Sequence, residues 1–230
     1  MQADTILEVS DLGVTIQDRV IIEHLSFTVR RGEVLTILGP NGAGKTVLLR
    51  ALLGLLPHAG SIAWKNAVRV GYVPQRLPPV REIPLCVEDF FTLKRHAGVD
   101  MREALRDVGL SEDLALQPLG DLSSGQLQRV LIAWALSGDP EVLLFDEPTA
   151  GIDIGGEETI YRLLARLRGE RNLTLLLVTH DLAVASELSS TVLCLNRRPI
   201  CHGPPLEVLT PQTLKKMYGT EVKYHRHAPG

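Results

Sequence analysis

The segment GPNGAGKT, from Gly39 to Thr46, constrains the fold of this chain more than any other feature of the sequence. It follows the apolar stretch EVLTIL and precedes the apolar stretch TVLLRALLGLL, so a buried strand, a glycine-rich turn and a helix are expected in succession. The glycines let the backbone bend and bring its N–H groups close to an anion, and the positive end of the helix dipole lies at the same point. The pattern G-x-x-x-x-G-K-[ST] in this context predicts a phosphate-binding loop.

Each residue of this loop has an expected contact with a nucleotide. Lys45 is expected to bridge the β- and γ-phosphates, and the Thr46 hydroxyl to hold Mg²⁺. The alternative is a glycine-rich turn with an incidental lysine, and the agreement of pattern and context argues against it. The predicted nucleotide contacts are Gly39, Pro40, Asn41, Gly42, Ala43, Gly44, Lys45 and Thr46.

Two carboxylates stand where a second buried strand ends, in VLLFDEP (142–148). Asp146 is expected at the carboxyl edge of a parallel sheet, where α/β folds bind ligands, and it can complete a Mg²⁺ shell. Glu147 can orient or deprotonate an attacking water. The alternative is a polar strand end whose exit is forced by Pro148, and the phosphate loop upstream favours a nucleotide-hydrolysis site instead.

Two further polar residues follow strands. His180, in VTHDL, could contact a γ-phosphate; the alternative is a loop histidine beside Asp181, a plausible N-cap for the next helix. Gln75, in YVPQ, stands at a strand end beside a proline, and could equally be an ordinary loop glutamine.

The segment LSSGQLQRV (122–130) places a small polar turn before a helix expected over 126–137. Ser123 and Gln126 fit a capping box, which needs no ligand. Gly125 is not explained by capping, because glycine in a helix costs up to about 1 kcal/mol relative to alanine. It makes sense if another group must approach the backbone closely.

The hydrophobic pattern predicts an α/β protein. ILEVSDLGVTI and VIIEHLSFTV alternate apolar and polar residues around the turn QDR, and read as antiparallel strands. Continuous apolar strands alternating with helices in the C-terminal half predict a parallel sheet covered on both faces. From Arg76 to about Leu122 the pattern is proline-rich and then helical. We expect one domain over 1–230, with a core of 1–80 and 139–230 and an inserted helical subdomain at about 81–138.

The amino-acid composition and charge argue against several classes of protein. The net charge of −3 gives no reason to expect binding to nucleic acid. The chain has no run of about 20 apolar residues that could span a membrane, and its N-terminus does not resemble a secretory signal.

Three cysteines without a CxxC pair suggest a reduced, cytosolic protein with inert thiols. A metal site could be formed by cysteine and histidine side chains near the C-terminus, namely Cys201, His202, His225 and His227. The tail KYHRHAPG is expected to be loosely ordered, so nothing in the sequence fixes the geometry of such a site.

Taken in order, these motifs resemble the nucleotide-binding subunit of ATP-binding cassette (ABC) transporters over essentially the whole chain. GPNGAGKT resembles Walker A, YVPQ the Q-loop, LSSGQ the family signature, LLFDEP Walker B, TAGID the D-loop and VTHD the switch histidine. The resemblance implies a P-loop NTPase core with a mainly parallel sheet, an N-terminal antiparallel β-subdomain and an inserted helical subdomain.

It also implies ATP and Mg²⁺ as cofactors, with Thr46, Gln75 and Asp146 at the metal. Glu147, Gln75 and His180 take catalytic roles. Two copies pair head to tail, so that the signature loop of one closes on the ATP of the other. The residues implied for that closure are Ser123, Gly125, Gln126 and Asp153.

The chain departs from the family pattern at two positions. Ser124 replaces the first glycine of the usual LSGGQ; the Ser123 hydroxyl and the Gly125 amide remain, so closure should survive. Ile16 stands where the family usually has an aromatic residue stacked on adenine, which predicts weaker stacking and looser nucleotide selectivity.

A narrower resemblance lies outside the ATPase motifs. RVGYVPQRLPPVREIPLCVEDFF, QRVLIAWAL and VLCLNRRPICHGPP look like the ATPase of bacterial zinc and manganese importers, most strongly zinc. It implies a peripheral subunit on the cytoplasmic face of the membrane, integral membrane permease subunits and, indirectly, a periplasmic or surface metal-binding protein. Import of manganese or iron chelate, a soluble ABC ATPase outside transport, and a regulator without turnover are the alternatives.

Overall fold

The computed structural model describes residues 4–65, 67–75, 84–94, 100–148 and 154–219. The chain divides into two compact units. The first unit comprises residues 1–66 and 174–230, and the second comprises residues 67–173. The predicted subdomain boundaries at 80/81 and 138/139 stay a prediction.

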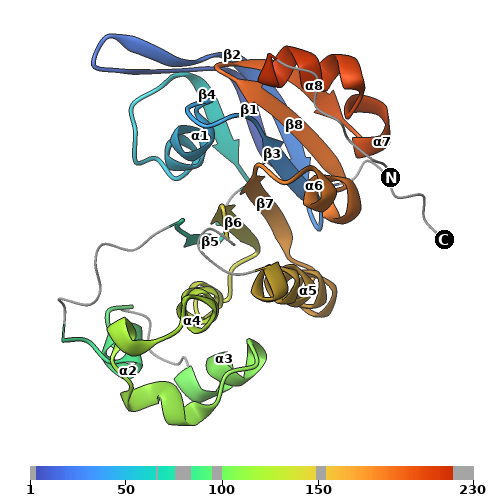
Figure 1. Cartoon of the computed structure of the whole chain (residues 1–230). Coiled ribbons are helices and arrows are strands. Elements are labelled where there is room, and N and C mark those ends of the chain that lie inside the picture. Colours follow the sequence, from blue (N-terminus) through green and yellow to red (C-terminus); the bar gives the residue numbers. More distant parts are fainter. Residues whose placement is uncertain (1–3, 66, 76–83, 95–99, 149–153, 220–230) are drawn as a thin grey trace. The chain divides into compact units, whose positions relative to one another are not determined.

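An antiparallel sheet forms the N-terminal part of the first unit (Figure 1). Its strand order is β2-β1-β4. The strands are β1 (Thr5–Ile16), β2 (Arg19–Arg30) and β4 (Ala59–Trp64). The two predicted strands are therefore confirmed, with their turn at residues 17 and 18, where both residues have positive φ. β4, which has little apolar alternation, was not anticipated.

A second group of strands in the first unit carries the phosphate loop. β3 pairs in parallel with β7 on one side and β8 on the other, and β9 adds antiparallel to β8. All residues of β3 and β7 are buried, as expected for a parallel sheet covered on both faces. These strands are β3 (Val34–Leu38), β7 (Thr174–Thr179), β8 (Thr191–Asn196) and β9 (Arg198–Gly203).

Short helices complete the first unit. α7 and α8 pack against β8 and β9 (Figure 1). The helices are α1 (Lys45–Leu52), α6 (Leu182–Leu188), α7 (Pro205–Val208) and α8 (Pro211–Tyr218). The apolar stretch after the phosphate loop predicted a helix up to Leu56; α1 ends at Leu52, and Gly54 has a φ of 70°, which ends helical geometry.

The second unit contains a parallel strand pair and helices. β5 (Val70–Val73) pairs in parallel with β6 (Val142–Asp146). Its helices are α2 (Val87–Thr92), α3 (Met101–Asp107), α4 (Ser124–Leu136) and α5 (Ile154–Arg171), with 3-10 turns at Glu112–Leu116 and Leu119–Asp121. The helical pattern expected before Leu122 is not one continuous helix: α3 ends at Asp107, and Gly109 takes a φ of 71°.

Two cysteines depart from expectation. Cys194 on β8 and Cys201 on β9 form a disulfide, so the prediction of three inert thiols is wrong for these two. Cys86 is the free cysteine, and its sulfur accepts a hydrogen bond from the Asp89 N–H at the start of α2. The disulfide needs β9 opposite β8, and the sequence of β9, RPICHG, gave no strand signal.

In the described part of the chain, no helix has the length and apolar character needed to cross a bilayer.

Candidate functional site

The phosphate loop runs from the end of β3 into α1 with the predicted backbone geometry. Gly42 and Gly44 have φ values of 78° and 99°, in the left-handed region that favours glycine. Gly44 is the N-cap of α1 and makes no side-chain cap hydrogen bond, as expected for a glycine, and the N-terminus of the helix faces the loop. The loop therefore has the donors and the helix end that an anion requires.

Lys45 lies along the inside of this loop. Its side chain is 6% exposed, and its Nζ donates hydrogen bonds to the Gly39 carbonyl at 2.9 Å and the Pro40 carbonyl at 3.1 Å. A phosphate oxygen is a stronger acceptor than a neutral carbonyl for an ammonium group. Lys45 is thus positioned to exchange these bonds for a phosphate.

The loop is packed from two sides. A Cβ atom on Gly39 would lie 2.1 Å from the Leu195 carbonyl oxygen, and the Ala43 carbonyl accepts a hydrogen bond from the Arg197 N–H at 3.1 Å. A Cβ atom on Gly44 would lie 3.2 Å from the Ile21 carbonyl oxygen. The β8–β9 turn and β2 therefore form the walls of the loop, and the sequence motif named neither.

His180 lies at the same sheet edge as the phosphate loop. Leu38 on β3 pairs with Thr179 on β7, so the residues that follow both strands emerge together. His180 is exposed there. Asp181 caps α6, accepting a hydrogen bond from the Ala183 N–H at 2.7 Å, so its expected role as an N-cap is confirmed. The contact of His180 with phosphate stays a prediction.

In the second unit, the predicted acidic pair lies beside Gln75. Val73 pairs with Phe145, so the ends of β5 and β6 coincide. The Gln75 Nε2 donates a hydrogen bond to the Glu147 carboxylate at 2.7 Å. Glu147 has a φ of 48°, a conformation uncommon outside glycine and concentrated at functional sites. The structure thus brings together Gln75 and Glu147, which the sequence placed 72 positions apart.

Asp146 is 2% exposed, and the Tyr72 hydroxyl lies 3.5 Å from its Oδ2. A carboxylate this deeply buried needs hydrogen-bond or cation partners. Sequence reasoning did not single out Tyr72. Its place on β5, three residues before Gln75 and beside the strand that ends in Asp146, is the signal that could have found it.

The signature segment starts α4 as predicted. The Ser123 hydroxyl accepts from the Gln126 N–H at 3.2 Å, and the Gln126 side chain accepts from the Ser123 N–H at 2.9 Å, so the capping box is confirmed. Among the described residues, a Cβ atom on Gly125 would meet nothing within 4 Å, so none of these residues requires glycine there. The predicted approach of an outside group to Gly125 stays a prediction, and Asp153 lies outside the described residues.

The remaining candidates lie away from these groups. Ile16 ends β1 and is 37% exposed. Cys201 is in the disulfide, so its sulfur is not a thiolate ligand here. His225 and His227 lie outside the described residues. Across the described ranges, no group of three or more histidine, cysteine or acidic side chains could hold a metal ion.

Comparison with known proteins gives one consistent result. A family model described as ABC transporter matches residues 22–150. A zinc import ATP-binding protein, ZnuC 1, of Hahella chejuensis is 40% identical over 96% of this chain and 86% of its own length. The ZnuC of Cereibacter sphaeroides is 44% identical over 86% of this chain and 82% of its own length.

A solved structure agrees with these relatives. CbiO1 of Clostridium perfringens, part of the ABC transporter complex CbiONQ, matches with a TM-score of 0.77 at 29% identity, covering 93% of this chain and 94% of that one. The fold expected from the sequence, an α/β core with an antiparallel N-terminal sheet and a helical insertion, is therefore confirmed.

Proposed function

This chain belongs to the ABC transporter family, and we propose that it is the ATP-hydrolysing subunit that powers zinc import across a bacterial cytoplasmic membrane. Identity of 40% to a zinc import ATP-binding protein over 96% of the chain is the observation that carries the proposal. Because this likeness extends well beyond the ATPase motifs, it bears on the transported ion as well as on ATP. Membership of this family implies that the chain binds ATP and that its hydrolysis of ATP is coupled to transport.

The phosphate loop and Lys45 would hold the phosphates of ATP. Its left-handed glycines, the N-terminus of α1 and the ammonium of Lys45, which lies along the inside of the loop, fit that ligand. His180 would contact the γ-phosphate from the same sheet edge. The roles of the loop and of Lys45 are supported by their place at a helix N-terminus, where anions are stabilised.

Mg²⁺ fits the oxygen ligands that the chain offers. Thr46, Asp146 and Gln75 would hold it, and it would neutralise charge on the phosphate oxygens. Glu147 would orient and deprotonate the attacking water, the task for which a carboxylate directly after the metal ligand is suited. Support comes from the burial of Asp146 and from the positive φ that turns Glu147 away from its strand.

The working form would be a head-to-tail dimer. The N-terminus of α4 presents Ser123, Gly125 and Gln126 with nothing within 4 Å of the glycine Cβ position, so a phosphate of a partner-bound ATP could approach the backbone. Asp153 would act at the same interface. Binding of two ATP molecules would close the dimer and hydrolysis would reopen it.

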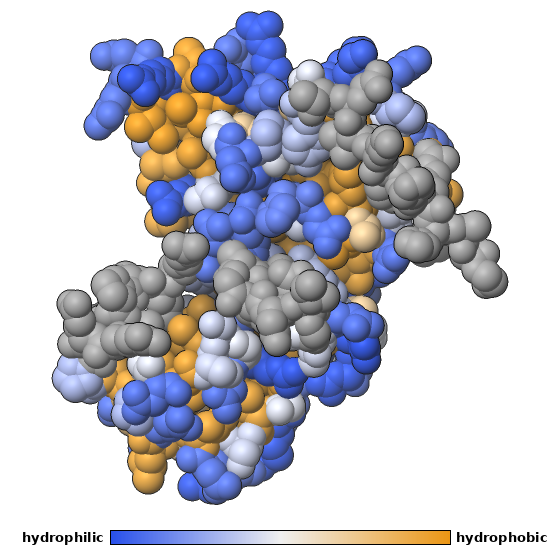
Figure 2. Space-filling model, in the orientation of Figure 1, coloured by the Kyte–Doolittle hydropathy of each residue, from blue (hydrophilic) through white to orange (hydrophobic). Residues whose placement is uncertain are grey.

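Membrane permease subunits would dock on the helical part of the second unit. Figure 2 shows hydrophobic surface there, and Leu93 and Leu116 are 60% and 77% exposed. The chain would then lie on the cytoplasmic face of the membrane, and a periplasmic or surface metal-binding protein would deliver the ion to the permease.

The decisive experiment is metal uptake with and without this gene. Cells lacking it should grow poorly under zinc chelation, recover with added zinc, and lose uptake of radiolabelled zinc while keeping uptake of manganese and chelated iron. If zinc uptake were unchanged and uptake of manganese or iron were lost, the transported ion would be manganese or iron and not zinc. Co-purification with an integral membrane protein separates a transporter from a soluble ABC ATPase.

A further inference from the structure

We propose that Cys194 and Cys201 form a thiol–disulfide switch that controls how firmly the phosphate loop is held, and hence the affinity for ATP. The inference rests on the ATP-binding role proposed above. All of its parts lie within the first unit of the chain.

The disulfide closes the hairpin formed by β8 and β9. Cys194 and Cys201 are direct partners across the two strands, with their Cα atoms 4.8 Å apart. The chain between them turns at residues 196–198, so the crosslink encloses the whole tip of the hairpin. Any motion of that tip is therefore limited by a covalent bond at its base.

The tip contacts the phosphate loop through its backbone. The Arg197 N–H donates to the Ala43 carbonyl at 3.1 Å, and the Leu195 carbonyl packs so closely on Gly39 that no Cβ fits between them. The opposite side of the tip contacts β2. There the Arg197 carbonyl accepts a hydrogen bond from the Glu23 N–H at 2.9 Å. The Arg198 guanidinium forms an ion pair with the Glu23 carboxylate at 2.5 Å. The tip thus lies between the phosphate loop and β2.

The strand pairing alone holds this tip weakly. The ladder between β8 and β9 has a register shift directly after Cys194, and the next pair, Leu195 with Pro199, includes a residue that lacks an N–H donor. β9 pairs on its other side with no named strand of the described sheet. Within the β8–β9 ladder the disulfide is therefore the last firm connection before the tip. Without it, the tip would be held by its hydrogen bonds and ion pair to neighbouring segments, and its motion and that of the loop beneath it should widen.

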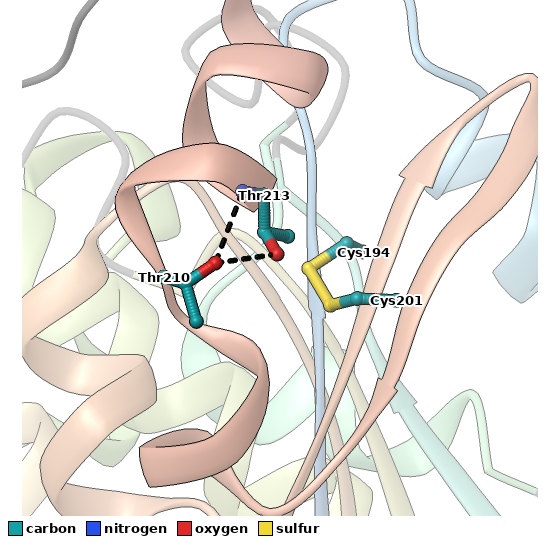
Figure 3. The surroundings of a disulfide bond; sticks show 4 residues. All are labelled: Cys194, Cys201, Thr210 and Thr213. Atoms are coloured by element: carbon teal, nitrogen blue, oxygen red, sulfur yellow. Dashed lines mark hydrogen bonds between the residues drawn. A yellow bond between two sulfur atoms is a disulfide. The ribbon is translucent and has the colours of Figure 1, made fainter.

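The two cysteine residues differ in burial. Figure 3 shows the disulfide between the strands, with the Thr210–Thr213 cap of α8 beside it. Cys194 is fully buried in an apolar cluster with Leu214 and Met217, whereas Cys201 is partly exposed. A thiolate would attack the Cys201 sulfur, because access decides which sulfur reacts.

The exchange balances with a dithiol reductant. Its first thiolate bonds to Cys201 and breaks the S–S bond, and Cys194 leaves as a thiolate that takes a proton. Its second thiol then displaces Cys201, which leaves as a thiol, so two electrons and two protons pass to the protein and the reductant becomes a disulfide. Disulfide oxidants of low molecular weight reverse the reaction. In reducing compartments most disulfides are transient, catalytic or redox-sensing, so the proposed cytoplasmic location favours a switch over a permanent crosslink.

The test compares the full-length chain with the disulfide formed and with it reduced, thiols being counted by mass spectrometry. Calorimetric titration with ATP in EDTA measures binding without hydrolysis. Reduction should raise the Kd for ATP roughly three- to tenfold, because contacts of the loop are loosened rather than removed. Amide exchange in residues 39–46 should quicken, while exchange in β6 of the second unit should not.

Variants separate the switch from a general effect of reductant. The double variant Cys194→Ala/Cys201→Ser should bind ATP like the reduced chain and ignore the redox state, and Cys86→Ser should respond like wild type. Equal Kd values for the oxidised and reduced chains would overturn the proposal, and so would a disulfide that stays intact in glutathione buffers of cytosolic composition. Loss of ATP binding in both states would instead overturn the proposed function and this inference with it.

Discussion

Glu147 and Gln75 are engaged with each other in this structure, although each has a different proposed role. The Gln75 amide donates to the Glu147 carboxylate at 2.7 Å. The amide therefore occupies the Glu147 oxygen that an attacking water would have to contact. We expect the pair to separate when Gln75 turns its oxygen toward Mg²⁺, which links metal binding to the release of the base.

Glu147→Gln tests the role of the base. The amide is nearly isosteric with the carboxylate but cannot accept a proton, so ATP binding should persist while phosphate release falls by about 10²- to 10⁴-fold. Glu170→Gln, on the exposed end of α5, is the matched control and should hydrolyse ATP at the wild-type rate. Turnover of Glu147→Gln at the parent rate would remove Glu147 from this role.

Tyr72→Phe tests whether Tyr72 positions Asp146. The variant removes the hydroxyl 3.5 Å from the Asp146 carboxylate and keeps the ring. Loss of a partner of a metal-binding carboxylate commonly lowers metal affinity tenfold or more, and this long contact should give about three- to tenfold. The Mg²⁺ concentration for half-maximal hydrolysis should rise by that factor, with the rate at saturating Mg²⁺ little changed. An unchanged Mg²⁺ dependence would show that Asp146 relies on other partners; Tyr161→Phe on α5 is the control.

At the scale of elements, the contact between the phosphate loop and the β8–β9 hairpin leaves no room for a side chain. Gly39 lacks a positive φ, so alanine there would suffer no backbone strain. Its Cβ would clash with the Leu195 carbonyl at 2.1 Å and would lie 3.0 Å from the Ala43 Cβ. The hairpin and the loop would then have to move apart. Overpacking of this kind usually costs about 1–3 kcal/mol.

We therefore expect Gly39→Ala to lower the free energy of unfolding by that amount and to weaken ATP binding. Gly169→Ala is the matched control. Its Cβ would meet nothing within 4 Å near the end of α5, and alanine should stabilise this helix by up to about 1 kcal/mol. Denaturant unfolding followed by ATP titration measures both effects. If Gly39→Ala were as stable as wild type, the β8–β9 hairpin would be able to move away from the loop at little cost in free energy.

The elements that sequence patterns predicted are those whose burial follows one simple period. β3, β6 and β7 are mostly apolar and are buried at every position, and the capping box and the Asp181 cap are local patterns of side chain and backbone. β4 (AGSIAW) and β9 (RPICHG) are mostly exposed or half-buried and exist because they pair with β1 and β8. Both are edge strands of their sheets, so their sequences lack the buried apolar pattern on which a local prediction depends.

The same criterion separates the site residues that the sequence predicted from those that it did not. The phosphate loop, Asp146 and Glu147 were found because each motif joins a strand to its chemistry within a few residues. The Gln75–Glu147 hydrogen bond, the contact of Tyr72 with Asp146 and the disulfide depend on which strands become neighbours. Motif spacing carries no information about that, because it is a property of the sheet.

At the scale of the whole molecule, the chain carries a phosphate loop in its first unit and the signature segment in its second. In a head-to-tail dimer, each ATP would be enclosed by the loop of one copy and the signature of the other. Lesions in the two motifs should then complement each other between copies. This follows from the symmetry of the dimer, whatever the rate of hydrolysis.

Lys45→Ala and Ser123→Arg provide the test. Lys45→Ala should lose ATP binding, because the ammonium that lies along the loop is gone, while Ser123→Arg should bind ATP as a monomer but block closure with its long side chain. Neither variant alone should dimerise with ATP. When they are mixed, each mixed dimer holds one site with both lesions and one with neither, so an ATP-dependent dimer should appear by size-exclusion chromatography. Because neither variant pairs with itself, every dimer in a 1:1 mixture is mixed and holds one intact site of two. With independent sites, hydrolysis should return to roughly half of the wild-type rate per chain. Failure of the mixture to form a dimer, or loss of monomer ATP binding in Ser123→Arg, would place the signature segment at the ATP of its own chain.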